Sequence, residues 1–320
     1  MSRVILHEQR PRTTWPVIAA GVLAAVYILA PVLALGVRVP WPKLADTLSA
    51  PATHDLLRVS LSAAALSTLL STILGTCLAL WLQQLRRVSH LVRLVVYLPL
   101  AMPPVVGGLA LTALLGRRGL LGPVLEQAGL HVSFAFPGVV AAHLFVTLPF
   151  VVVAVDSALR QLDPEVVASA RGIGLSAGTI LRRIILPAIL PAVFTGGALA
   201  FARSLGEFGT TITFAGSLPG STRTMPSGIY LEREVSADNA YALSAVLIGI
   251  AILTLTAAGI PLLLRRRREQ AVRALQPMDP VALRTMTSPQ DSPRDLLATV
   301  GDTTTTFRGG RVTAVVGPNG

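Results

Sequence analysis

Residues 163–209 read DPEVVASARGIGLSAGTILRRIILPAILPAVFTGGALAFARSLGEFG, and they join a short polar segment to a long apolar one. Asp163 is of the type that caps a helix, because its side chain can accept a hydrogen bond from a free backbone N–H of the first turn. Pro164 suits the first helical position, where its missing N–H costs nothing, and Glu165 suits the positive end of the helix dipole. The sequence therefore predicts that a helix begins at Pro164.

This first helix is short and amphipathic. Its apolar residues recur at helical spacing: Val166, Ala170 and Ile173. Gly172 and Gly174 end it before it is long enough to cross a membrane. Ser176 opens a second helix, and two arginines then mark a membrane surface just before Pro187. We therefore expect a hairpin of two short helices over residues 163–183, held at the membrane face without catalytic side chains, where a partner protein binds.

The composition of the whole chain is typical of a membrane protein. Of its 320 residues, 52% are hydrophobic and only 13% are charged, whereas an ordinary soluble domain has roughly 25% charged residues. The formal net charge of +11 does not indicate a nucleic-acid partner, because the basic residues are spread over short loops between apolar runs. They favour contact with lipid headgroups instead. We predict an all-α protein that crosses the membrane several times.

Six nearly uncharged runs are long enough to cross a membrane as helices. They cover residues 16–37, 59–82, 94–116, 133–155, 184–205 and 240–264. The first is longer than the core of a signal peptide, so we expect it to remain as a span. The third contains several prolines and glycines and is predicted to bend. Arg265–Arg268 are predicted to stop the sixth span abruptly.

The distribution of arginines predicts the orientation of these spans. Six spans place both ends of the chain on one side of the membrane. Most arginines lie in the two ends, in the loop after the second span and in the hairpin, and loops rich in arginine stay in the cytoplasm. We therefore expect a cytoplasmic segment at residues 1–14, a transmembrane domain over residues 15–270, and a hairpin that faces the cytoplasm.

Small residues of the hairpin follow a fixed spacing. Three small residues are followed, after three intervening positions, by a glycine. Nine further positions separate this glycine from the sequence I-x-L-P. The residues of the pattern are Ala168, Ser169, Ala170, Gly174, Ile184, Leu186 and Pro187. This spacing resembles the EAA loop of ABC importer permeases, and the resemblance implies that these residues couple the chain to an ABC ATPase. The glutamate of the family pattern is Ala168 here. Glu165, one turn earlier, is the candidate to replace it.

A longer resemblance lies downstream. Residues 206–230, GEFGTTITFAGSLPGSTRTMPSGIY, are similar to the corresponding segment of molybdate permeases. The two resemblances imply the six-helix fold of an ABC type I importer permease in a bacterial inner membrane. They also imply transport of molybdate, with tungstate or sulfate as the nearest alternatives. The implied partners are an ABC ATPase, a periplasmic or lipoprotein molybdate-binding protein and a second copy of this chain.

Two charges near the end of the fifth span have alternative interpretations. Arg203 either attracts an oxyanion while neighbouring glycines allow close approach, or it pairs with Glu207 four residues later. We favour the ion pair, because an importer should not hold its substrate tightly in transit. The candidate residues of the pathway or gate are Arg203, Gly206, Glu207, Phe208, Gly209, Thr210 and Thr211. Residues 216–226 are predicted to form an outer loop or short re-entrant turn where a solute-binding protein docks.

The sequence contains no convincing catalytic set and no Cys/His spacing typical of a metal site. His143 lies within the fourth span, and we favour a hydrogen-bonded packing role over a functional one. An ion-coupled secondary transporter would have internal repeats and charged, broken helices near mid-membrane. A membrane-embedded enzyme would have converging ionisable groups in its spans. Neither pattern is evident, so both classes remain as weaker alternatives.

The composition changes again after the sixth span. Residues 271–295 have the proline and serine content of a linker. Residues 296–320 predict a pair of strands split by Arg308–Arg311 and a buried strand at Val312–Val316. The last residues fit the opening of a phosphate-binding loop: Gly317, Pro318, Asn319 and Gly320.

In that position, downstream of a permease, the opening resembles the start of a fused ABC ATPase domain. The chain stops before the lysine and the Ser or Thr of the loop. We therefore expect ATP and Mg²⁺ to bind to a partner or to the missing ATPase domain rather than to this fragment.

Overall fold

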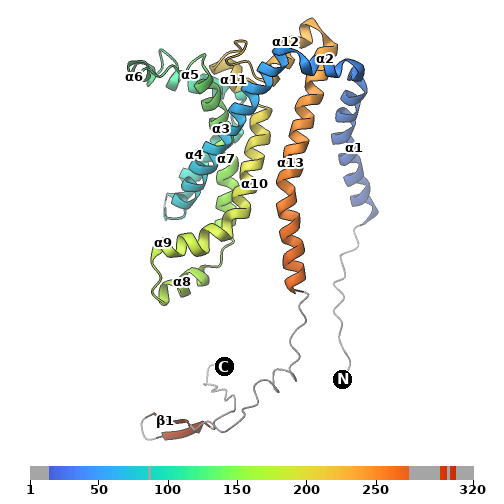
Figure 1. The fold of residues 1–320 in the computed structure, drawn as a ribbon. Helices are drawn as coiled ribbons and strands as arrows, with labels where there is room; N and C mark the ends of the chain where they lie inside the picture. Colours follow the sequence, from blue (N-terminus) through green and yellow to red (C-terminus); the bar gives the residue numbers. More distant parts are fainter. Residues whose placement is uncertain (1–13, 86–87, 274–295, 301–302, 308–320) are drawn as a thin grey trace. The chain divides into compact units, whose positions relative to one another are not determined.

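The structure is a computed structural model that describes residues 14–85, 88–273, 296–300 and 303–307. It divides into two compact units, residues 1–262 and 263–320, each described by itself. The helices are α1 (Trp15–Arg38), α2 (Leu44–Ser49), α3 (Pro51–Leu82), α4 (Ser89–Ala101), α5 (Pro104–Leu115), α6 (Gly122–Gln127), α7 (Phe136–Arg160), α8 (Pro164–Gly172), α9 (Ala177–Ile180), α10 (Leu186–Leu205), α11 (Gly209–Phe214), α12 (Met225–Val235) and α13 (Ala237–Arg273) (Figure 1). A 3₁₀ turn (Trp41–Lys43), a π-helical turn (Leu181–Ile185) and two strands, β1 (Leu296–Val300) and β2 (Thr303–Phe307), complete the described elements.

The number of membrane-spanning helices agrees with the prediction. Five helices are long and apolar enough to cross a membrane: α1, α3, α7, the continuous helix Ala177–Leu205, and the Ala237–Ala257 part of α13. A sixth crossing is obtained when the bent pair α4 and α5 is counted as one span. The prediction of a helical, multi-pass membrane protein is therefore confirmed.

The predicted bend in the third span is a complete break. The axes of α4 and α5 differ by 115°. Met102 and Pro103 between them have extended backbone, with ψ values of 133° and 135°. Each of these two residues precedes a proline, and the proline ring disfavours helical backbone in the residue before it. The two consecutive prolines, Pro103 and Pro104, thus explain the position of the break.

Two helix ends differ from the sequence expectation. The second span begins at Pro51 rather than at residue 59. The expected start was set by the apolar run, but the polar residues before it are also helical. The last helix continues through Arg265–Arg268 to Arg273, so these arginines do not end the helix; that they end the membrane span stays a prediction. Arginine is a good helix former, and the cluster ends only the apolar stretch.

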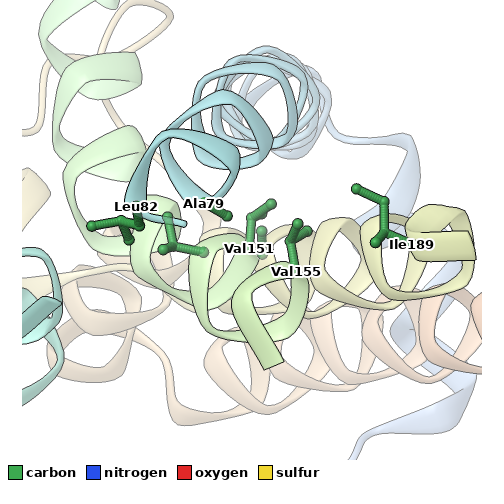
Figure 2. Packing of buried hydrophobic residues seen from close by; sticks show 7 residues of the cluster. Ala79, Leu82, Val151, Val155 and Ile189 are labelled. Atoms are coloured by element: carbon green, nitrogen blue, oxygen red, sulfur yellow. The ribbon is translucent and has the colours of Figure 1, made fainter. Parts of the chain in front are cut away.

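The core of the membrane unit lies where α3, α7 and α10 pack together. Its buried residues are Ala79, Leu82, Val151, Val152, Val155, Ile189 and Ala200 (Figure 2). Glycines bring these helices close: an added Cβ on Gly75 would lie 3.0 Å from Val151, and one on Gly196 would lie 3.1 Å from Ala154. Small residues at helix contacts are the usual means of packing in lipid, where the hydrophobic effect does not drive helices together. The apolar side chains of α1, by contrast, remain exposed.

The second unit contains an antiparallel hairpin. Leu296 is paired with Phe307, and Val300 with Thr303. β1 and β2 therefore form one hairpin, whereas the predicted split at Arg308–Arg311 lies outside the described residues. The predicted linker over 274–295, the strand Val312–Val316 and the phosphate-loop residues Gly317 to Gly320 lie outside the described residues.

Candidate functional site

The hairpin 163–183 forms as its local signals predict. The Asp163 carboxylate accepts a hydrogen bond from the Glu165 N–H at 2.9 Å and caps α8. The helix ends at Gly172, and Gly174 has φ of +84°, in the left-handed region where a side chain is strained. Ser176 then caps α9 through a hydrogen bond of 3.3 Å from the Thr179 N–H.

The second half of the hairpin is joined to the fifth span without a gap. The chain from Ala177 to Leu205 is one helix of 29 residues, interrupted only by the π-helical turn Leu181–Ile185. In this turn the Leu186 N–H bonds to the Leu181 carbonyl, five residues back. Pro187 follows and has no N–H to donate, so the wider turn adapts the helix to the proline. α9 and α10 are therefore parts of one continuous helix.

The residues predicted to contact an ATPase differ in accessibility. Those at the surface are Glu165, Ala168, Ser169, Gly174 and Pro187, while Ile184 and Leu186 are half-buried and Ala170 is buried. The apolar stripe of α8 does not pack as a unit. Ala170 faces the chain, whereas Val166 and Ile173 are exposed, Ile173 by 78%. Exposed apolar side chains on a short helix are typical of a surface that a partner covers.

A buried carboxylate near the hairpin was missed by the sequence analysis. Asp156 on α7 is 2% exposed and is surrounded by donors from three helical segments. Arg93 of α4 donates two hydrogen bonds, each 3.0 Å long, to its two oxygens. Arg160, one turn later, donates at 2.6 and 3.0 Å, Gln83 at the end of α3 at 2.7 Å, and the Tyr97 hydroxyl at 3.3 Å. The only sequence signal was the i, i+4 spacing of Asp156 and Arg160.

At the other end of α10, the helix breaks over residues 206–208 before α11 begins. Glu207, in this break, is 1% exposed. One carboxylate oxygen lies 2.6 Å from Arg203 Nη2, and the other accepts a hydrogen bond of 2.8 Å from the Thr210 N–H. The favoured interpretation of the Arg203–Glu207 pair, an internal ion pair, is therefore confirmed. The Glu207 carboxylate thus caps the first turn of α11, and its negative charge is compensated by Arg203 at the end of α10.

The two broken segments meet each other. A Cβ added to Gly108 of α5 would lie 2.6 Å from the Thr213 Cβ of α11, and one on Gly209 would lie 2.5 Å from the Pro104 Cβ. Both distances are too short for real side chains, so only glycine allows this contact. The Phe208 ring packs on Tyr230 of α12 with centroids 5.1 Å apart, while Gly206 is exposed. Irregular backbone at membrane depth is tolerated where it is buried in protein or lines a water-filled passage.

Buried polar side chains lie on α11 and on the helices α7, α10 and α3. Thr210 and Thr211 are fully buried, and neither hydroxyl has a hydrogen-bond partner within the described residues. His143 of α7 bonds through Nδ1 to the Ser204 hydroxyl at 2.6 Å, and Ser204 is 3.0 Å from Ser67 of α3. His143 is therefore hydrogen-bonded, as the favoured interpretation expected, but its buried Nε2 has no partner within the described residues.

Elsewhere in the parts of the chain that the structure describes, no group of three or more His, Cys, Asp or Glu residues is placed to hold a metal ion.

Comparison with known proteins assigns this architecture. A family model described as "Binding-protein-dependent transport system inner membrane component" matches residues 67–269. The molybdenum transport system permease protein ModB of Mycobacterium tuberculosis is 42% identical over 250 residues, which cover 78% of this chain and 94% of that protein. The sulfate transport system permease protein CysT of Salmonella typhimurium is 30% identical over 220 residues, which cover 68% of this chain and 79% of that protein.

A solved structure shares the fold. It is a bacterial alginate ABC transporter in complex with an alginate pentasaccharide-bound periplasmic protein, with a TM-score of 0.63 at 17% identity over 77% of this chain and 93% of that chain. The family match covers more than half of the sequence and includes the hairpin and both breaks. The chain therefore belongs to the family of binding-protein-dependent transport system inner membrane components, and it is a transport subunit rather than an enzyme.

Proposed function

We propose that this chain is the membrane-spanning subunit of an ATP-driven importer of molybdate. The observation that carries the proposal is the 42% identity to a protein named for molybdenum transport, which extends over nearly all of that protein. The sulfate permease CysT matches less closely, at 30%, and it supports sulfate or tungstate as the second candidate. All three substrates are tetrahedral dianions, so the permease itself needs only modest selectivity and a binding protein supplies most of it.

The hairpin 163–183 is the proposed contact with the ATPase. Support comes from its exposed α8 surface, with Glu165, Val166 and Ile173 directed away from the rest of the chain. It also comes from the unbroken helix that joins α9 to α10. When the ATPases close, the hairpins swing and α10 moves with them, which opens the pathway to the other side. Replacing Gly174 by Trp should abolish uptake without preventing membrane insertion, and normal uptake by this variant would contradict the coupling role.

The translocation pathway is proposed to pass the two breaks, with a second copy of the chain forming its other wall. The neutral Arg203–Glu207 pair offers no free charge to trap a dianion. The Thr210 and Thr211 hydroxyls lack partners within the described residues and provide weak contacts. Such an arrangement permits passage without tight binding, as conduction requires. A periplasmic or lipoprotein binding protein is proposed to deliver the substrate near residues 216–226.

The proposed location is a bacterial inner membrane, with both termini and the hairpin in the cytoplasm. The excess of arginines on that side supports this orientation. It can be tested because Cys77 is the only cysteine. In a Cys77→Ala background, a cysteine introduced at Ile173 should react with a membrane-impermeant thiol reagent only after the cells are opened. Reaction in intact spheroplasts would place the hairpin outside and remove the ATPase contact.

We also propose that residues 296–320 are the start of an ABC ATPase domain, after a linker over 271–295. The β1–β2 hairpin and the G-P-N-G sequence at 317–320 support this assignment. The genomic sequence that follows Gly320 tests it. The proposal expects a lysine followed by Ser or Thr at positions 323 and 324, and any other sequence there contradicts it.

The substrate is tested by uptake in cells that lack other molybdate and sulfate permeases and express this chain with its partner proteins. Labelled molybdate should accumulate in an ATP-dependent manner, and excess unlabelled sulfate should compete only weakly. If sulfate accumulates and molybdate neither accumulates nor competes, the sulfate alternative is correct. If neither oxyanion accumulates while the complex is assembled in the membrane, the proposed substrate class is wrong.

A further inference from the structure

The buried carboxylate of Asp156 connects parts of the chain that are far apart in sequence. Its two oxygens accept hydrogen bonds from Gln83 after α3 and from both Arg93 and Tyr97 on α4. The Arg93 contact is bidentate, the geometry that holds a guanidinium in a fixed orientation relative to a carboxylate. The Asp156 side chain is 2% exposed and that of Arg93 is 11% exposed. Three helical segments are therefore fixed to one another at a single point.

This point lies close to the hairpin. Asp156 is one turn before Arg160, the last residue of α7, and α8 begins at Pro164. An open cavity of about 720 Å³ separates α8 and α9 from the end of α3, and Gln83 forms part of its wall. Because this cavity separates the hairpin from the end of α3, the hairpin is connected to the membrane helices at its two ends. One connection is the end of α7, and the other is the continuous helix of α9 and α10. The Asp156 cluster stands at the first of these two connections.

The same cluster lies at one end of the broken third span. Arg93 and Tyr97 belong to α4, which leads through the break at Met102 and Pro103 into α5. At its far end this span packs against α11, where Gly108 and Gly209 allow close contact. A displacement of α4 therefore shifts α5 against α11, at the place proposed above for the pathway. Such a connection is measured as a coupling between the two positions.

We propose that Asp156 is a positioning residue that makes α4 move together with the hairpin, so that ATPase closure reaches the α5–α11 contact as well as α10. This inference rests on the coupling role proposed for residues 163–183. It adds a second route to the direct one through α10. The Arg93 guanidinium is the main link, because Arg160 lies on the same helix as Asp156 and its side chain is half exposed.

The movement is tested with pairs of spin labels in a Cys77→Ala background of the whole transporter complex. One pair joins Ile173 in the hairpin to Leu91 on α4, and a reference pair joins Ile173 to Leu253 on α13; all three side chains are exposed. When the complex is trapped with ATP and vanadate, the reference distance should change, while the mean 91–173 distance should stay constant and its distribution narrow. In Asp156→Asn combined with Arg93→Met, the 91–173 distance should change or broaden.

The double variant is chosen because it removes both charges and leaves no buried charge without a partner. It should reach the membrane and melt close to the parent protein. The number of substrate ions moved per ATP should fall by about two- to thirtyfold, the range of coupling effects seen for residues between two sites. Asp238→Asn is the matched control, because Asp238 forms only an exposed pair with Lys43, and it should leave this ratio unchanged.

The outcomes separate this inference from the function on which it rests. If the reference distance does not change in the parent protein, the hairpin does not respond to ATP, and both the coupling role and this inference are wrong. If it changes but the 91–173 distance changes equally in parent and double variant, or if the double variant moves as many ions per ATP as the parent, only the role of Asp156 is wrong.

Discussion

Replacement of Gly108 by alanine should weaken the contact between the two broken segments. The new Cβ would lie 2.6 Å from the Thr213 Cβ and 3.0 Å from the Thr210 carbonyl oxygen. Neither atom is the free end of a flexible side chain, so α5 and α11 must separate. Overpacking of this kind costs about 1–3 kcal/mol. Alanine in place of a helical glycine also contributes about 0.5–1 kcal/mol of stabilisation, which has to be subtracted.

A graded series of Gly→Ala variants isolates the steric part. Gly249 on α13 has no atom within 4 Å of an added Cβ, so Gly249→Ala shows the gain in helix propensity alone. Gly107 is intermediate, because its Cβ would meet the Phe145 ring edge at 3.3 Å and the ring can shift. The difference between the Gly108 and Gly249 variants therefore gives the cost of the clash, about 1–3 kcal/mol. That difference corresponds to a gap in melting temperature of about 2–12 °C.

The series is measured as thermal unfolding of the detergent-solubilised protein, and transport is measured in parallel. The expected order of melting temperature is Gly249→Ala highest, Gly107→Ala intermediate and Gly108→Ala lowest. Uptake should fall with Gly108→Ala, because the α5–α11 contact is part of the proposed pathway. If the Gly108 and Gly249 variants melt at the same temperature, α5 and α11 are not in close contact, and the argument built on the two breaks fails.

Three other changes test the remaining contacts. Ser204→Ala removes the hydrogen bonds that join α10 to α3 and α7. It should destabilise the protein by about 0.6–1.7 kcal/mol, from the average to the maximum measured for such bonds in membranes, and a larger loss would indicate a more extensive network. Arg203→Gln should cost about 3 kcal/mol because it leaves the buried Glu207 carboxylate without its charge partner, and adding Glu207→Gln should restore most of the melting temperature; no recovery would argue against the ion pair. Gly174→Ala should lower uptake, because its positive φ costs a side chain about 1–2 kcal/mol, whereas Gly172→Ala in the same hairpin should not; equal uptake by the two variants would show that the backbone of Gly174 is unimportant.

Features that depend on neighbours in the sequence were predicted from the sequence. The spans follow from runs of apolar residues, and the hairpin follows from the capping residues Asp163 and Ser176 and from the glycine at position 174. The ion pair of Arg203 with Glu207 was predictable because the two residues are only four apart in the sequence, although Glu207 lies just beyond the end of α10. In each of these cases the interacting groups lie within about one turn of each other, so local spacing was sufficient.

Features that depend on distant residues were not predicted. The fourth span was expected to end at residue 155, which left Asp156 outside it, although Arg93 on α4, with a side chain only 11% exposed, compensates its charge. The contact of Gly108 with α11 could not be inferred either, because a glycine in an apolar run gives no indication of which helix approaches it. The pairing of β1 with β2 was also missed, because threonine-rich runs favour extended structure but do not specify which run pairs with which.

The π-helical turn Leu181–Ile185 sets the rotational phase between α9 and α10. Such a turn holds one residue more than an α-helix of the same length, and each residue of an α-helix rotates the chain by about 100°. Deleting one residue from this turn would leave α9 attached to the fifth span but directed to a different side of it. The direction in which the hairpin projects from the fifth span is therefore fixed by a single surplus residue.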